Sequence, residues 1–200
     1  MHKRAPTDFP IHDLIAERWS PRAVSENEIA PEILASLFEA ARWAPSSSNE
    51  QPWAYIVGMK NDSENFAKLL SVLVPANVSW AKNAPVLALA VAKLVFANSG
   101  KPNHNGQHDV GAASAWLTVE ATSRGIFVHQ MAGFDRDKAR EIFAIPAEWE
   151  PMAAMAIGYP GDPQTLPQPL RDRELAPRTR KPISEFVMSG KWGQKATFLP

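Results

Sequence analysis

The feature that most restricts the fold is an apolar run, APVLALAVA, at residues 84–92. It spans about half of the roughly 20 apolar residues that a membrane helix needs. Pro85 stands near its start, and the turn-forming residues ANSG follow at 97–100. We therefore predict that residues 85–96 form a central strand of a sheet, with a buried helix as the alternative.

Helical and strand-like patterns alternate on both sides of this run. The predicted helices cover 11–19, 29–44, 62–74, 109–125 and 135–145, and the predicted strands cover 53–59, 126–132 and 152–160. We expect one domain over residues 1–200, with a core at about 8–160. Prolines crowd the region after 160, so we expect an extended arm over about 161–200 that wraps a partner subunit.

Charge and cysteine content exclude several classes of protein. The 21 basic and 21 acidic residues cancel, so no net field favours nucleic acid or an anionic membrane. Cysteine is absent, which excludes disulfides, thiolate nucleophiles and iron–sulfur clusters. The first 13 residues lack the apolar run of a signal peptide, and we expect a cytoplasmic protein that binds neither membrane nor nucleic acid.

Pairs of closely spaced arginines lie near both ends of the chain. Arg18, Ser20 and Arg22 stand in RWSPR, and Arg178 and Arg180 stand in PRTRKP. Guanidinium groups bind phosphate oxygens bidentately, so the two sets together could hold a phosphate monoester. The alternative is that they are surface arginines paired with acidic residues such as Glu17, Glu174 or Glu185.

Two further segments could contact a neutral, flat ligand. A row of small polar residues, SSSNEQ at 46–51, lies between a helix that ends at Pro45 and the strand that begins at Trp53. The alternative for this row is an ordinary hydrophilic loop. In HQMAGFD, Gly133 follows a predicted strand, where glycine permits close backbone approach and leaves an N–H available; a plain strand-to-helix turn is the alternative.

No known catalytic motif supplies a reactive group. G-x-G-x-x-G, P-loop, G-x-S-x-G and H-E-x-x-H patterns are all absent. His104 and His108 are four residues apart, but they lie in a segment of loop-forming residues, so we do not expect a metal site. An enzyme built on this chain would take its reactive group from a cofactor.

The order of these motifs resembles the nitroreductase family of FMN-dependent oxidoreductases. The resemblance covers LIAERWSPRAVS, LFEAARWAPSSSNEQPWAYIV, HDVGAASAWLTVEATSRGI, MAGFD, AIGYP and RTRKPISEFV, nearly the whole chain. It implies an α+β, three-layer sandwich with a mixed central sheet flanked by helices. It also implies an intertwined homodimer with two FMN molecules at the subunit interface.

By the same resemblance, the arginine segments meet the FMN phosphate and the polar row reaches the flavin from the other subunit. The backbone at Ala132 and Gly133 approaches the flavin N5, and Asn77 lies at the pyrimidine edge. No side chain is expected to be catalytic, since the flavin carries the hydride. The implied cofactor-binding residues are Arg18, Trp19, Ser20, Arg22, Pro45, Ser46, Ser47, Asn49, Gln51, Asn77, Met131, Ala132, Gly133, Arg178 and Arg180.

The implied activity is hydride transfer from NADH or NADPH to flat acceptors such as nitroaromatics or quinones, by a ping-pong scheme. Many family members carry a proline and an acidic residue where this chain has Gln130 and Ala132. Two alternatives stay open: a flavin-binding carrier or sensor without turnover, and a family variant with reductive dehalogenase or flavin-cleaving chemistry.

Overall fold

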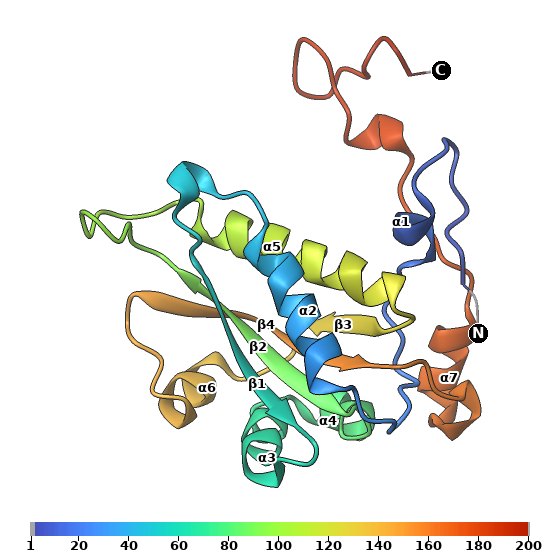
Figure 1. Ribbon diagram of the computed structural model, residues 1–200. Coiled ribbons are helices and arrows are strands. Elements are labelled where there is room, and N and C mark those ends of the chain that lie inside the picture. Colours follow the sequence, from blue (N-terminus) through green and yellow to red (C-terminus); the bar gives the residue numbers. More distant parts are fainter. Residues whose placement is uncertain (1–2, 200) are drawn as a thin grey trace.

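A computed structural model describes residues 3–199 and contains one sheet with helices on both faces (Figure 1). The strands are β1 (Trp53–Met59), β2 (Val86–Lys93), β3 (Phe127–Met131) and β4 (Trp149–Gly158). The helices are α1 (Asp13–Glu17), α2 (Pro31–Arg42), α3 (Ser63–Ser71), α4 (Pro75–Ala81), α5 (Gly106–Ser123), α6 (Arg136–Ile142) and α7 (Gln168–Leu175). Short 3-10 turns lie at η1 (Ser47–Asn49), η2 (Pro163–Thr165) and η3 (Ile183–Glu185).

The apolar run at 84–92 does form a central strand. The sheet order is β1-β2-β4-β3, and β2 is buried along nearly its whole length. Its side chains alternate between two cores: Leu87, Leu89 and Val91 face α3, α4 and α6, whereas the neighbouring positions of β2 face α2 and α5. The expected three-layer α+β sandwich is thus confirmed.

Two details of the expected architecture are wrong. The three strand pairings among the described residues are all antiparallel, so this chain alone does not build a mixed sheet. The region after 160 is not extended throughout, because α7 forms at 168–175 with Pro169 in its first turn, where the missing N–H breaks no helical hydrogen bond. Leu166 and Glu174 are buried, so this part of the expected arm packs on the body.

The chain beyond α7 exposes large aromatic side chains. Figure 1 shows the final segment, in red, projecting away from the sheet and helices. Phe186, Trp192 and Phe198 expose 65%, 94% and 73% of their surface there. Such aromatic exposure is typical of a segment that contacts another chain.

None of the helices formed by residues 3–199 combines the length and apolar content that a bilayer crossing requires.

Candidate functional site

The Arg18–Ala23 segment is anchored by its one aromatic residue. α1 ends at Glu17 with Arg18 as its C-cap, and Trp19 then enters the core with 7% of its surface exposed. The Trp19 and Phe127 rings meet edge to face with centroids 6.1 Å apart. Burial of the indole fixes the segment between the first helix and the start of β3.

Side chains from distant elements hold the main chain of this segment. The Glu174 carboxylate on α7 accepts hydrogen bonds from Arg22 N, at 3.0 Å from each oxygen, and from Ala23 N at 3.1 Å. His129 on β3 donates from Nδ1 to the Pro21 carbonyl at 3.0 Å. The segment therefore has a fixed path, set by contacts to residues more than 100 positions away in sequence.

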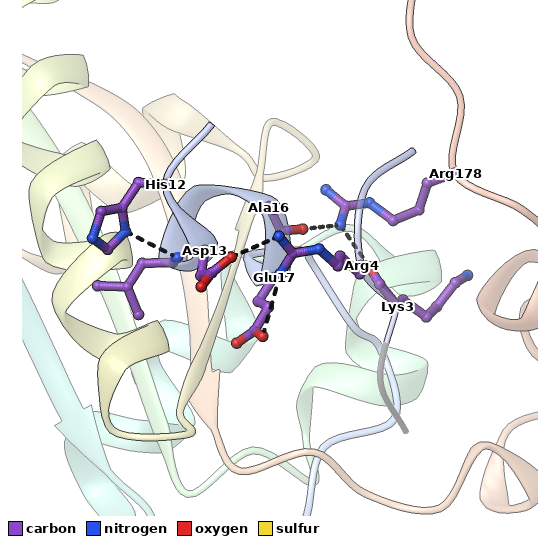
Figure 2. A network of polar contacts seen from close by, with 8 residues as sticks. Lys3, Arg4, His12, Asp13, Ala16, Glu17 and Arg178 are labelled. Carbon is purple, nitrogen blue, oxygen red and sulfur yellow. Dashed lines mark hydrogen bonds and ion pairs between the residues drawn. The ribbon is translucent and has the colours of Figure 1, made fainter. Parts of the chain in front are cut away.

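Arg178 completes this support from the region after α7. Its guanidinium donates to the carbonyls of Lys3 at 2.6 Å, Ala16 at 2.8 Å and Arg18 at 2.8 Å. Figure 2 shows this group reaching over the first residues of the chain beside α1. Three of the five N–H groups of Arg178 are thus engaged by main-chain carbonyls, and two remain for a ligand.

The arginines from both ends of the chain line one cavity of about 260 Å³. Its wall contains Lys3, Arg18, Ser20, Arg22, Arg173, Glu174, Arg178 and Arg180. Arg18 donates to Ser20 Oγ at 3.2 Å, and within residues 3–199 the Arg22 side chain has no hydrogen bond or ion pair. Burial, and then the charges of Arg178 and Arg180, lower the pKa of Arg18 from its ordinary value. We call this the cationic cavity; its charge is not balanced by the described residues, which fits an anionic group.

Gly133 lies just after the end of β3. His129 contacts Pro21, and Gly133 follows four residues later, about 13 Å along an extended chain. The Gly133 carbonyl accepts from Asn77 Nδ2 at 2.9 Å and from Val74 N at 3.1 Å. Its N–H donates to no group within residues 3–199, so the donor is available to a ligand.

Asn77 and Gly133 pack so closely that no side chain fits at 133. A Cβ on Gly133 would lie 2.7 Å from Asn77 Nδ2 and 2.9 Å from Val74 Cγ2. Ala132 is exposed beside them, whereas Met131 is 4% exposed and belongs to the core. Of the predicted group at 131–133, Met131 can therefore offer only its backbone.

The polar row at 46–51 is held in an unusual conformation. Ser48, Asn49 and Gln51 have positive φ values of 54°, 55° and 50°, which non-glycine residues seldom adopt. The main-chain N–H of Ser47 donates to Asp109 Oδ2 at 3.0 Å, and Gln51 N donates to Ser46 Oγ at 3.0 Å. Pro45, Asn49 and Gln51 remain exposed.

Within one chain the polar row does not meet the cationic cavity. Asp109 in the first turn of α5 holds the row, whereas Thr122 in the last turn lines a small cavity with Trp19. In Figure 1 the segment that contains η1 lies beside the start of α5, and α1 lies beyond the other end of that helix. Its 18 residues correspond to a length of about 27 Å at 1.5 Å per residue.

His104 and His108 both lie near the start of α5. Among residues 3–199 no cluster of three or more potential metal ligands is present. α5 begins at Gly106 rather than at Asp109, so His108 lies in its first turn while His104 precedes it. His108 Nδ1 lies 3.1 Å from Asp109 Oδ1.

Comparison with known proteins decides the family. The sequence profile described as "Nitroreductase family" matches residues 15–159, most of the chain. This chain belongs to the nitroreductase family. It is 34% identical to a solved structure described as an oxidoreductase containing FMN, with a TM-score of 0.90 over 96% of this chain and 97% of the other.

Two relatives illustrate the range of this nitroreductase-family fold. A protein of Archaeoglobus fulgidus, provisionally named NADH dehydrogenase/NAD(P)H nitroreductase, is 28% identical over 74% of this chain and 84% of that protein. Iodotyrosine deiodinase 1 of Sus scrofa is 22% identical over 90% of this chain and 68% of the deiodinase.

Sequence reasoning missed three residues of the site. Glu174 was predicted only as an ion-pair partner, yet it binds main-chain N–H groups. His129 stood in the HQMAGFD motif without an assigned role, and Asp109 was predicted only to begin a helix. A buried Glu or His is hard to recognise from sequence, because its partners lie far along the chain.

Proposed function

We propose that this protein is an FMN-dependent oxidoreductase that transfers hydride from NADH or NADPH to flat acceptors such as nitroaromatics or quinones. One observation carries the proposal. The cavity rich in unbalanced arginine charge lies beside the segment that His129 of β3 holds, and Gly133, with an unused main-chain N–H, follows His129 by four residues, about 13 Å along an extended chain. A ligand with a phosphate at one end and a flat ring at the other matches that arrangement.

The residues present fit FMN. The phosphate would be held by Arg18, Ser20, Arg22, Arg180 and the two remaining N–H groups of Arg178. Because a phosphate monoester is close to a dianion at neutral pH, these cations balance it locally in a chain without net charge. Bound FMN would supply the hydride chemistry, and the unused Gly133 N–H would be available as a hydrogen-bond donor to its ring, where such a donor stabilises negative charge.

We further propose a homodimer in which the polar row of one subunit completes the site of the other. The row at 46–51 lies too far from the cationic cavity of its own chain to share a ligand with it. A contact surface for the partner is provided by exposed apolar residues. They are Ile15 on α1, Trp116 on α5 and the aromatic residues of the final segment. In this arrangement Pro45, Ser46, Ser47, Asn49 and Gln51 face the flavin from the partner subunit.

NAD(P)H as the donor is supported by the name of the Archaeoglobus fulgidus relative. The proposed kinetic scheme is ping-pong: the oxidised nicotinamide leaves before the acceptor occupies the same face of the ring. Asn77 lies beside Gly133 and would contact the pyrimidine edge.

The decisive experiment is flavin loading followed by turnover. Purified protein should bind FMN, become yellow and be bleached anaerobically by NADH or NADPH, and added quinone or nitroaromatic should restore the colour. A halogenated phenol in the same panel tests the dehalogenase alternative suggested by the deiodinase relative. Protein that stays colourless after FMN addition contradicts the proposal, and a yellow protein without turnover indicates a carrier or sensor.

A further inference from the structure

Glu174 lies in the wall of the cationic cavity but pairs with none of its guanidinium groups. Only 1% of its surface is exposed, and its carboxylate accepts hydrogen bonds from Arg22 N and Ala23 N. A buried carboxylate among six cationic side chains would ordinarily form an ion pair with one of them. Here the main chain occupies both of its oxygens instead.

This choice of partner has two consequences. The N–H groups of Arg22 and Ala23, which would otherwise point at an anion, are already satisfied. The guanidinium of Arg22 has no partner within residues 3–199, and that of Arg18 reaches only Ser20 Oγ. The carboxylate therefore fixes the main chain at Arg22, four residues after Arg18, without neutralising either guanidinium.

We propose that Glu174 is a positioning residue that presents Arg22, on the segment that also carries Arg18, to the phosphate of the flavin cofactor. This inference rests on the proposed function. It assigns Glu174 a role in recognising the phosphate alone, since the hydrogen bonds of its carboxylate are to residues 22 and 23 and do not reach Gly133.

Geometry and charge make opposite predictions for the variant Glu174→Gln. If only charge mattered, removing a negative group beside a phosphate dianion would strengthen binding of FMN. If Glu174 positions the backbone, Gln offers one acceptor oxygen and turns an amide N–H toward the main-chain donors, so the segment shifts and binding weakens. The sign of the change therefore distinguishes the two roles.

The test measures flavin affinity of the full-length apoprotein by fluorescence quenching, for FMN and for riboflavin, which lacks the phosphate. For Glu174→Gln we expect FMN to bind about tenfold more weakly, the loss of roughly one charge-assisted hydrogen bond, with riboflavin affinity unchanged. Glu185→Gln is the matched control, because Glu185 is an exposed carboxylate of the same region, 4.0 Å from Lys181. It should change neither affinity.

Glu174→Asp provides a second variant if the Gln variant does not fold. It keeps the charge but withdraws the carboxylate by one methylene, so a loss of FMN affinity with riboflavin unchanged again supports positioning. Tighter or unchanged FMN binding, or an equal loss for both flavins, overturns the inference. Failure of the proposed function looks different, because the unsubstituted protein would then bind neither flavin.

Discussion

The imidazole Nδ1 of His129 donates a hydrogen bond to the carbonyl of Pro21, 3.0 Å away, and the ring packs against Trp80 with centroids 4.6 Å apart. A carbonyl can only accept, so Nδ1 carries the proton of the neutral ring. His129 thus links β3 to the segment that carries Arg18 and Arg22.

Acid should destabilise the protein through His129. Burial, aided by the charge of Arg22, lowers the pKa of His129 from 6.5 to about 4. The unfolded chain takes up this proton as pH falls below about 6.5 and the folded chain does so only near 4, so stability is lost as pH falls through that window. The expected loss is about 3 kcal/mol in the free energy of unfolding.

Urea unfolding of the apoprotein at several pH values, compared with His129→Asn, isolates this contribution. Asn can keep a donor to Pro21 but does not titrate, and the carboxylates common to both proteins cancel in the difference. Parallel pH profiles for the two proteins would show that His129 is not the titrating group.

Removing both Arg18 and Arg22 should weaken FMN binding. Each charge-assisted hydrogen bond to phosphate contributes about 1.5–3 kcal/mol, so the double alanine variant should lose at least about tenfold in affinity. Arg42→Ala is the control, because Arg42 pairs with Glu39 on the exposed end of α2. Flavin titration with unchanged affinity in the double variant would mean that the phosphate lies elsewhere.

Gly133→Ala should destabilise the fold and disturb the turn after β3. The added methyl would lie 2.7 Å from Asn77 Nδ2, and moving Asn77 breaks its hydrogen bond to the Gly133 carbonyl. We expect a cost of about 1–3 kcal/mol, measured by urea unfolding. Adding Asn77→Ala should recover part of this loss, and equal stabilities of the two variants would argue against the contact.

Asp109→Ala should loosen the polar row. It removes the acceptor for Ser47 N and leaves that donor beside a loop with three positive φ values. A lost buried acceptor of this kind should cost about 1–3 kcal/mol in the free energy of unfolding. Limited proteolysis should show faster cleavage near residue 48, whereas Asp137→Ala, on exposed α6, should show no change.

The final segment should be needed for dimerisation but not for folding of the chain. Phe186, Trp192 and Phe198 are exposed, so replacing all three with alanine removes few contacts within the chain. We expect analytical ultracentrifugation to show a dimer weakened by at least about tenfold, since buried aromatic residues dominate interface energies. An unchanged dimer in a normally folded variant would locate the interface elsewhere.

Local pattern predicted much of the fold. The strand within 85–96 and the helix within 62–74 follow from the pattern of neighbouring residues. The meeting of the arginine segments from the two chain ends does not, because they lie about 160 residues apart in the sequence. α4 was not predicted, although Pro75 at its first position is a recognised start signal. α7 was not predicted either, because the prolines after residue 160 indicated an extended chain. Proline disrupts the interior of a helix but is compatible with its first turn, where Pro169 lies.

The sequence by itself determined which residues are strand-forming, which are helical and which carry positive charge, since these depend on side-chain chemistry and spacing of a few residues. Only the tertiary structure decided that the Glu174 carboxylate binds the main chain of Arg22 rather than a guanidinium. It also decided that three N–H groups of Arg178 donate to main-chain carbonyls. Those partners are separated by about 150 residues or more along the chain. Their contacts exist because the packing of β3, α1 and α7 brings them within hydrogen-bond distance, and no local pattern records that distance.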